Sequence, residues 1–152
     1  MSSKRLAMIS ALMFVTWGLL HLAGGALILT RLSEGADAAY SIYAGGEGLY
    51  PPLAGSVLGY LAYSFAWTGL LVAAIGGALG RRHSPPALAL CTFVGAVTEV
   101  GLVLFLVLPG FVSWGEALAG MIIFAIAIVT GGIACNHSTS ASGVQTQTAL
   151  PG

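Results

Sequence analysis

The stretch LAMISALMFVTWGLLHLAGGALILT, residues 6–30, decides the fold class of this chain. It contains no charged side chain and one ionisable ring, that of His21. Lys4 and Arg5 precede the stretch and Arg31 follows it. Because a helix needs about 20 mostly apolar residues to cross a bilayer, the stretch predicts a membrane-spanning helix with a histidine inside the apolar layer.

The composition extends this expectation to the whole chain. Of the 152 residues, 57% are hydrophobic and 7% are charged, whereas a soluble domain carries about 25% charged residues. Because so few charges cannot cover a water-facing surface, we expect the chain to lie in a lipid bilayer. The formal net charge is zero and the sequence has no extended basic cluster, so we expect no nucleic-acid partner.

Three further apolar runs are long enough to span a membrane. Together with the first run, they predict helices at residues 6–30, 54–80, 86–108 and 114–135. The predicted fold class is therefore all-α integral membrane, a four-transmembrane-helix bundle in a single domain at 1–135. The Ser-, Thr-, Gln- and Gly-containing segment 136–152 is expected to form a disordered tail.

Two of these helices carry cap signals at their amino ends. Ser84 and Pro85 suit the N-cap and the first helical position of the third helix. Ser113 and Glu116 have the spacing of a capping box at the start of the fourth helix. We therefore interpret Glu116 as a helix cap.

The basic residues indicate how the bundle is oriented. Most of them fall on one side of the predicted spans: Lys4, Arg5, Arg81 and Arg82. Because cytoplasmic ends carry the excess of Lys and Arg, both termini are predicted to be cytoplasmic, in a multi-pass protein of the plasma (inner) membrane. The loop at 32–53 then faces outward, where its tyrosines anchor it at headgroup level or the loop covers a cavity as a lid.

Three polar side chains from different helices fall at a similar predicted depth. His21 lies ten residues before Arg31, Glu99 lies ten residues before Pro109, and Ser64 lies ten residues after Ala54. Each is therefore about 15 Å from the predicted outer end of its helix, at 1.5 Å per residue. In lipid, small and polar residues turn toward neighbouring helices. Gly24 and Gly25, close behind His21, then leave room for another helix or for a ligand. These residues predict a pocket in the outer half of the bundle.

Ionisable side chains at this depth are the candidate functional groups. A charged group inside the membrane costs about 2.5–3.5 kcal/mol on insertion scales, and such residues usually have a partner or a function. We interpret His21 and Glu99 as a candidate catalytic acid–base pair. The side chains expected to bind a ligand beside them are Trp17, Tyr60, Tyr63, Ser64 and Trp67.

A purely structural interpretation stands beside this one. A hydrogen bond between His21 and Glu99 would fix the helices in register without any chemistry. The aromatic side chains would then be packing residues or part of the interfacial aromatic belt.

Three functions are consistent with these residues. The first is a pocket for a lipophilic small molecule, in a membrane-embedded acid–base enzyme of the isomerase or epoxide-opening type. The second is a non-enzymatic accessory subunit of a larger membrane complex. The third is a protomer of an oligomeric proton-coupled transporter. The expected partners are the lipid bilayer, a lipophilic molecule, and either a second copy of the chain or another membrane subunit.

The sequence requires no cofactor. Cys91 and Cys135 lack metal-site spacing, so we expect buried thiols and no metal site. Haem is a weaker hypothesis, because His21 has no second histidine at a matching depth. No residue motif assigns the chain to a family, and the layout of four spans does not decide a function.

Overall fold

The computed structural model describes residues 2–35, 52–82, 84–110 and 112–147, and this part of the chain is helical without strands. Its elements are α1 (Ser3–Glu34), α3 (Pro52–Arg82), α4 (Pro85–Leu102), the π-helix η1 (Val103–Val107) and α5 (Trp114–Gln147). Within the described residues, four segments are long and apolar enough to cross a membrane: Ser3–Glu34, Val57–Gly80, Pro85–Val107 and Trp114–His137. The prediction of four apolar helices of spanning length is confirmed. The lid hypothesis falls on residues 36–51, which lie outside the described residues.

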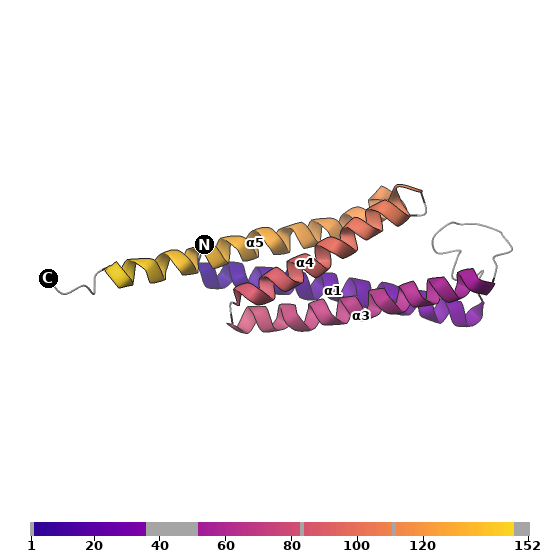
Figure 1. Cartoon of the computed structure of the whole chain (residues 1–152), viewed down its shortest axis with the longest axis horizontal. Coiled ribbons are helices and arrows are strands. Elements are labelled where there is room, and N and C mark those ends of the chain that lie inside the picture. Colours follow the sequence, from indigo (N-terminus) through magenta and orange to yellow (C-terminus); the bar gives the residue numbers. More distant parts are fainter. Residues whose placement is uncertain (1, 36–51, 83, 111, 148–152) are drawn as a thin grey trace.

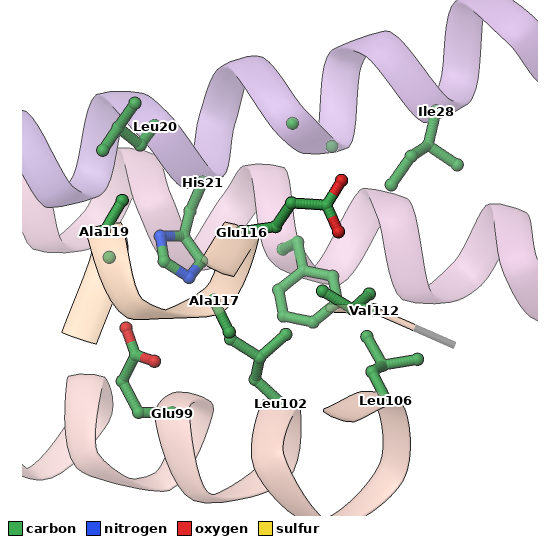
Figure 2. A pocket seen from close by; sticks show the side chains of 14 residues that line it. Leu20, His21, Ile28, Glu99, Leu102, Leu106, Val112, Glu116, Ala117 and Ala119 are labelled. Atoms are coloured by element: carbon green, nitrogen blue, oxygen red, sulfur yellow. The ribbon is translucent and has the colours of Figure 1, made fainter. Parts of the chain in front are cut away.

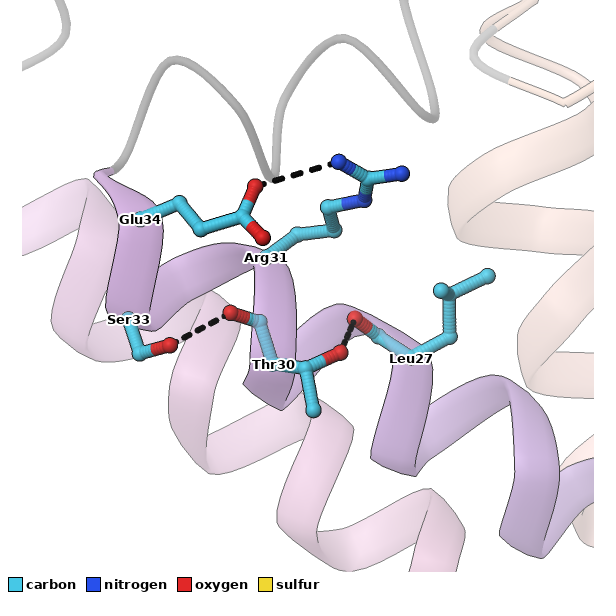
Figure 3. Close-up of polar contacts among 5 residues, drawn as sticks. All are labelled: Leu27, Thr30, Arg31, Ser33 and Glu34. Carbon is cyan, nitrogen blue, oxygen red and sulfur yellow. Dashed lines mark hydrogen bonds and ion pairs between the residues drawn. The ribbon is translucent and has the colours of Figure 1, made fainter.

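α1 continues beyond the apolar run that predicted it. Polar side chains support its last turns, as Figure 3 shows. The hydroxyl of Thr30 donates to the carbonyl oxygen of Leu27 at 2.7 Å, and that of Ser33 donates to the carbonyl oxygen of Thr30 at 2.6 Å. Arg31 and Glu34 form an exposed ion pair at 3.0 Å. These contacts stabilise the turns of α1 that lie beyond the apolar stretch.

α5 shows the largest difference from the sequence-based boundaries. Disorder was expected from Asn136 onward, whereas the backbone is helical to Gln147. Extending a formed helix costs little, because each added residue gains one backbone hydrogen bond, and no proline occurs between these two residues. Residues 148–152 lie outside the described residues.

The four helices form a ring in which α1 and α4 are diagonal to each other. α1 packs against α3 and α5, and α4 packs against the same two helices. Figure 1 shows α1 and α3 as one antiparallel pair and α4 and α5 as another. The two pairs come together around the amino-terminal half of α1 and diverge toward the end where α1 finishes and α5 begins.

Small residues bring α1 and α3 into close backbone contact. A Cβ atom added at Gly18 would meet the carbonyl oxygen of Gly69, and one added at Gly25 would lie 2.5 Å from the carbonyl oxygen of Ala62. On both helices these positions repeat every seven residues, which keeps one seam facing the partner helix in coiled-coil packing. Any larger side chain at these glycines would push the two helices apart.

The core does not fill the bundle evenly. Its main cluster draws buried residues from all four helices: Phe14, Trp17, Val72, Leu79, Cys91, Phe124 and Ala127. Toward the far end of α1, a second cluster contains Ile28, Leu58 and Ala62, which belong to α1 and α3 alone. The α4–α5 pair therefore contributes no buried residue to this second cluster, and the diverging pairs leave a space between them.

Polar contacts fix the ends of α4 and α5 as the sequence predicted. The Ser84 hydroxyl oxygen accepts a hydrogen bond from the Ala87 amide at 3.5 Å. At the start of α5, the Ser113 amide donates to Glu116 at 3.0 Å, and the Glu116 amide donates back to the Ser113 hydroxyl at 3.3 Å. Both predicted N-terminal caps are confirmed.

The predicted third span is not a uniform α-helix. After Leu102 the hydrogen bonding widens into η1, and the Leu108 amide donates to the carbonyl oxygen of Val103 at 2.9 Å. Single π-turns inside α-helices occur frequently at functional sites. This one begins one turn after Glu99 and places Leu106 on the wall of the space between the helix pairs.

Candidate functional site

A pocket of about 320 Å³ lies between the diverging helix pairs. α1, α3, α4, η1 and α5 all contribute to its wall, as Figure 2 shows in close-up. Three ionisable side chains line it, those of His21, Glu99 and Glu116, and every other lining residue is Gly, Ala, Val, Leu, Ile or Phe. Its size falls at the lower end of the range for small-molecule sites, about 300–1,000 Å³.

Glu99 is the polar group held most tightly in this pocket. It belongs to α4, and its residue is 6% exposed. Its Oε1 accepts a 2.6 Å hydrogen bond from Nε1 of Trp17. Its Oε2 is buried and has no hydrogen-bond partner among the described residues. Figure 2 shows the carboxyl group rising from α4 toward the side of the pocket where His21 lies.

Trp17 contacts two of the ionisable side chains of the pocket, those of Glu99 and His21. Its side chain is 0% exposed, and its ring packs 5.6 Å, centroid to centroid, from the ring of Phe124. The His21 ring lies over the same indole with a centroid distance of 3.8 Å and an interplanar angle of 31°. The indole therefore binds Glu99 through its N–H and supports His21 through its face.

The hydrogen bond of His21 defines which nitrogen is available to a ligand. Nδ1 lies 3.0 Å from the carbonyl oxygen of Trp17. Because a carbonyl oxygen only accepts, Nδ1 carries the proton, and in the neutral ring Nε2 presents a lone pair. Among the described contacts, no hydrogen bond or ion pair joins His21 to Glu99. The two side chains reach the pocket from α1 and α4, which lie on the diagonal of the bundle.

Glu116 combines the predicted cap with a place in the pocket wall. Its Oε2 accepts hydrogen bonds from the Ser113 amide at 3.0 Å and the Ser113 hydroxyl at 2.7 Å. Glu116 is exposed, and it lines the same pocket as Glu99. Sequence reasoning identified only the cap. The available signal was that Glu116 lies four residues before Gly120, so both face the same side of α5.

The two glycines behind His21 have different roles. Gly25 packs against α3, where a Cβ atom added to it would lie 2.8 Å from the amide nitrogen of Ala66. Gly24 has nothing within 4 Å of an added Cβ atom, and it lines the pocket. Gly25 therefore makes room for a helix, while Gly24 borders open space.

The structure does not bring the predicted aromatic residues of α3 into this pocket. The exposed fractions of Tyr60, Tyr63 and Trp67 are 71%, 60% and 58%, and none of them lines the pocket. The reason is that α3 turns its small-residue face, with Ala62 and Gly69, toward α1. The aromatic side chains consequently lie on the outside of the bundle.

Ser64 lies in a second pocket, of about 460 Å³, between α3 and α4. Its hydroxyl group donates to the carbonyl oxygen of Tyr60 within its own helix at 2.8 Å. Thr98, next to Glu99 in sequence, also lines this pocket. Phe65 and Leu106 line both pockets, so these two side chains stand between them. Of the seven predicted site residues, the structure brings together His21, Glu99 and Trp17.

Within the described residues, no group of three or more His, Cys, Asp or Glu side chains is placed to hold a metal ion. The thiol of Cys91 is buried in the main core cluster, 3.9 Å from the carbonyl oxygen of Val72. The site thus consists of carboxylate, imidazole and indole groups around an apolar space.

Comparisons of this chain with protein-family models, with curated proteins and with solved structures found no match.

Proposed function

We propose that this chain is a small polytopic membrane protein that binds a lipophilic small molecule in the pocket between its two helix pairs. The observation that carries this proposal is the carboxyl group of Glu99. Glu99 lines the pocket, and its Oε2 is buried without a hydrogen-bond partner among the described residues. A polar group of a bound molecule would complete its hydrogen bonding.

A purely structural role leaves half of this carboxyl group unexplained. The contact that joins α1 to α4 needs only Oε1, which accepts from Trp17. A buried polar atom without a partner costs about 1–3 kcal/mol. Glutamine at this position would keep an acceptor for Trp17 and carry no charge, so helix registration alone does not require a carboxyl group.

The remaining wall of the pocket suits an apolar molecule. In Figure 2, Ile28, Leu106 and Val112 lie toward one side of the pocket, while His21 and Glu99 lie toward the other. A ligand with a polar head and an apolar body matches this distribution, because few well-placed polar groups orient a ligand and apolar surface supplies most of its affinity.

The pocket can be tested with Trp17 as a reporter. Replacing Trp67 and Trp114, which are 58% and 52% exposed, by Phe leaves Trp17 as the only tryptophan. We expect 1-bromododecane to quench Trp17 fluorescence in the purified full chain with a saturable midpoint, since heavy-atom quenching acts at short range and Trp17 is shielded from the surroundings.

Two glycine variants make this test specific. Gly24→Leu fills the pocket and is expected to remove the saturable quenching. Gly77→Leu is the matched control, because its added Cβ atom also meets nothing within 4 Å and it lines neither pocket. The proposal fails if the parent shows no saturable quenching or if Gly24→Leu is quenched like the control.

The proposal also places the helices across a membrane, with both chain termini in the cytoplasm of a cell whose plasma membrane holds the protein. Its support is the length and apolar character of the four segments and the basic residues flanking them. In a background with both cysteines replaced by Ala, a membrane-impermeant maleimide applied to intact cells is expected to label Ser33→Cys and not Ser2→Cys. The reverse labelling would contradict this orientation.

A second candidate function is an acid–base enzyme. It is favoured by the placement of His21 and Glu99 on different helices around one cavity without a bond between them. Both groups then remain available to a substrate, one to give a proton and the other to take one.

Opening of 1,2-epoxydodecane to its diol, in which water adds across the ring, tests this candidate by mass spectrometry. We expect the parent chain to form the diol, and His21→Gln and Glu99→Gln each to lower the rate by about 10²- to 10⁴-fold. An inactive parent, or full activity in both variants, would remove this candidate and leave the binding proposal in place.

A further inference from the structure

We propose that the polar group of the ligand is a hydrogen-bond-donating cation, a protonated alkylamine whose ammonium group is held by the carboxylate of Glu99. This inference rests on the proposed lipophilic pocket and specifies the chemistry of its occupant.

With both carboxyl groups ionised and the imidazole neutral, the side chains of the pocket offer acceptors and no donor toward a ligand. Glu99 contributes Oε2, which has no partner. His21 contributes Nε2, because its other nitrogen is bonded to the carbonyl oxygen of Trp17. Glu116 contributes the oxygen that is not bonded to Ser113. The other lining residues have no polar side-chain atom. A complementary ligand must therefore supply the donors.

The charges favour a cation over a neutral donor. Two carboxyl groups, those of Glu99 and Glu116, line the pocket, and no Lys or Arg is among its lining residues. Arg31, further along α1, is paired with Glu34. An ammonium group brings three N–H donors and a positive charge, and hydrogen bonds between ionised groups are about twice as strong as neutral ones. A fatty acid would bring a third carboxylate and more acceptors.

The arrangement of the two carboxyl groups gives the ligand a direction. Glu99 is buried and lies on the same side of the pocket as His21 (Figure 2), whereas Glu116 is exposed at the start of α5. The ammonium group then lies at Glu99, with the ring of Phe65 in the same wall, since an aromatic face attracts a cation. The alkyl chain extends along Leu102 and Leu106 toward the side of the pocket where Ile28 and Val112 lie (Figure 2).

Competition against the quenching of Trp17 by 1-bromododecane tests this inference. The competitors share one chain length and differ in the head group: dodecylamine, dodecan-1-ol, 1,2-epoxydodecane and dodecanoate. We expect dodecylamine to relieve the quenching at a concentration about tenfold or more below the concentration of dodecan-1-ol that is needed. A charge-assisted hydrogen bond accounts for an affinity difference of this size. The epoxide and dodecanoate are expected to compete less well than the alcohol.

Two carboxyl variants assign the effect to the site. Glu99→Gln keeps an acceptor for Trp17 and is expected to reduce the advantage of dodecylamine over dodecan-1-ol to about twofold or less. Glu116→Gln keeps the capping box, which accepts Gln as well as Glu. We expect it to weaken competition by dodecylamine and to leave competition by dodecan-1-ol unchanged. If Glu99→Gln does not fold, Glu116→Gln still tests whether the negative charge of the pocket favours dodecylamine over dodecan-1-ol.

The outcomes separate this inference from the proposed function. Saturable quenching of the parent by 1-bromododecane together with equal competition by dodecylamine and dodecan-1-ol would overturn the amine inference and leave the lipophilic pocket standing. Stronger competition by dodecanoate or the epoxide would do the same. Absence of saturable quenching in the parent would overturn both.

Discussion

Trp17 on α1 donates a 2.6 Å hydrogen bond to Glu99 on α4, across the diagonal of the four-helix ring. α1 and α4 share their neighbours α3 and α5 but do not pack extensively on each other. A long aromatic donor is therefore needed to span the centre of the bundle. The bond uses one oxygen of the carboxyl group, and it leaves the other, Oε2, buried without a partner among the described residues, in a residue that lines the pocket.

Removing the donor should destabilise the bundle. Trp17→Phe leaves both oxygens of Glu99 without a partner and opens space in the main core cluster. We expect the free energy of unfolding to fall by about 1–3 kcal/mol for the unpartnered acceptor, with a further loss for the smaller ring. Unfolding by SDS, followed by circular dichroism, measures this change.

Trp67→Phe is the matched control, because the same replacement is made at a 58% exposed position of α3. Its effect is expected to stay within about 0.5 kcal/mol. Equal destabilisation by the two replacements would show that the Trp17–Glu99 bond does not hold the helix pairs together.

The close contact of α1 with α3 predicts opposite effects for two glycines on the same helix. Gly18→Ala places a methyl group against the backbone of α3, where an added Cβ atom would lie 2.7 Å from the Ala73 amide nitrogen. We expect it to cost about 1–3 kcal/mol. Gly24→Ala meets open space and is expected to stabilise the helix by up to about 1 kcal/mol. The same SDS unfolding measurement compares them, and a stabilising Gly18→Ala would contradict the described helix contact.

The sequence predicted these helices well, because the information that defines them is local. Apolar runs define the four long helices, and the caps at Ser84 and Ser113 depend on residues three positions apart. The similar depth of His21 and Glu99 below the ends of their helices was predicted by counting residues along each helix. Both residues line one pocket. Helical rise alone sets such depths.

The rotation of each helix about its axis was harder to predict. α3 carries a polar aromatic face and a small-residue face, and which of them meets α1 depends on backbone approach between two helices. The sequence interpretation placed Tyr60, Tyr63 and Trp67 inside, whereas the contact of Gly69 with Gly18 turns them outward. The partner of Glu99 was missed for a similar reason, because Trp17 and Glu99 meet across the centre of a ring that only the assembled bundle defines.

The outward position of these aromatic residues makes a prediction about binding. Tyr60→Phe and Tyr63→Phe, added together to the reporter chain in which Trp67 and Trp114 are already Phe, should leave the midpoint of 1-bromododecane quenching within about twofold, since peripheral substitutions change free energies by about 0.5 kcal/mol or less. A loss as large as that of Gly24→Leu would instead make them ligand-binding side chains.

Phe65 separates the two pockets, and its removal should change which ligands enter. Phe65→Ala would join the space of about 320 Å³ beside His21 with that of about 460 Å³ between α3 and α4. We expect this variant to gain saturable quenching of Trp17 by 1-bromoadamantane, a compact and bulky probe, while the unchanged wall at Leu102 still admits 1-bromododecane. Phe105→Ala is the control, because Phe105 lines only the second pocket. If Phe105→Ala admits 1-bromoadamantane as readily as Phe65→Ala, then Phe65 is not the residue that divides the two spaces.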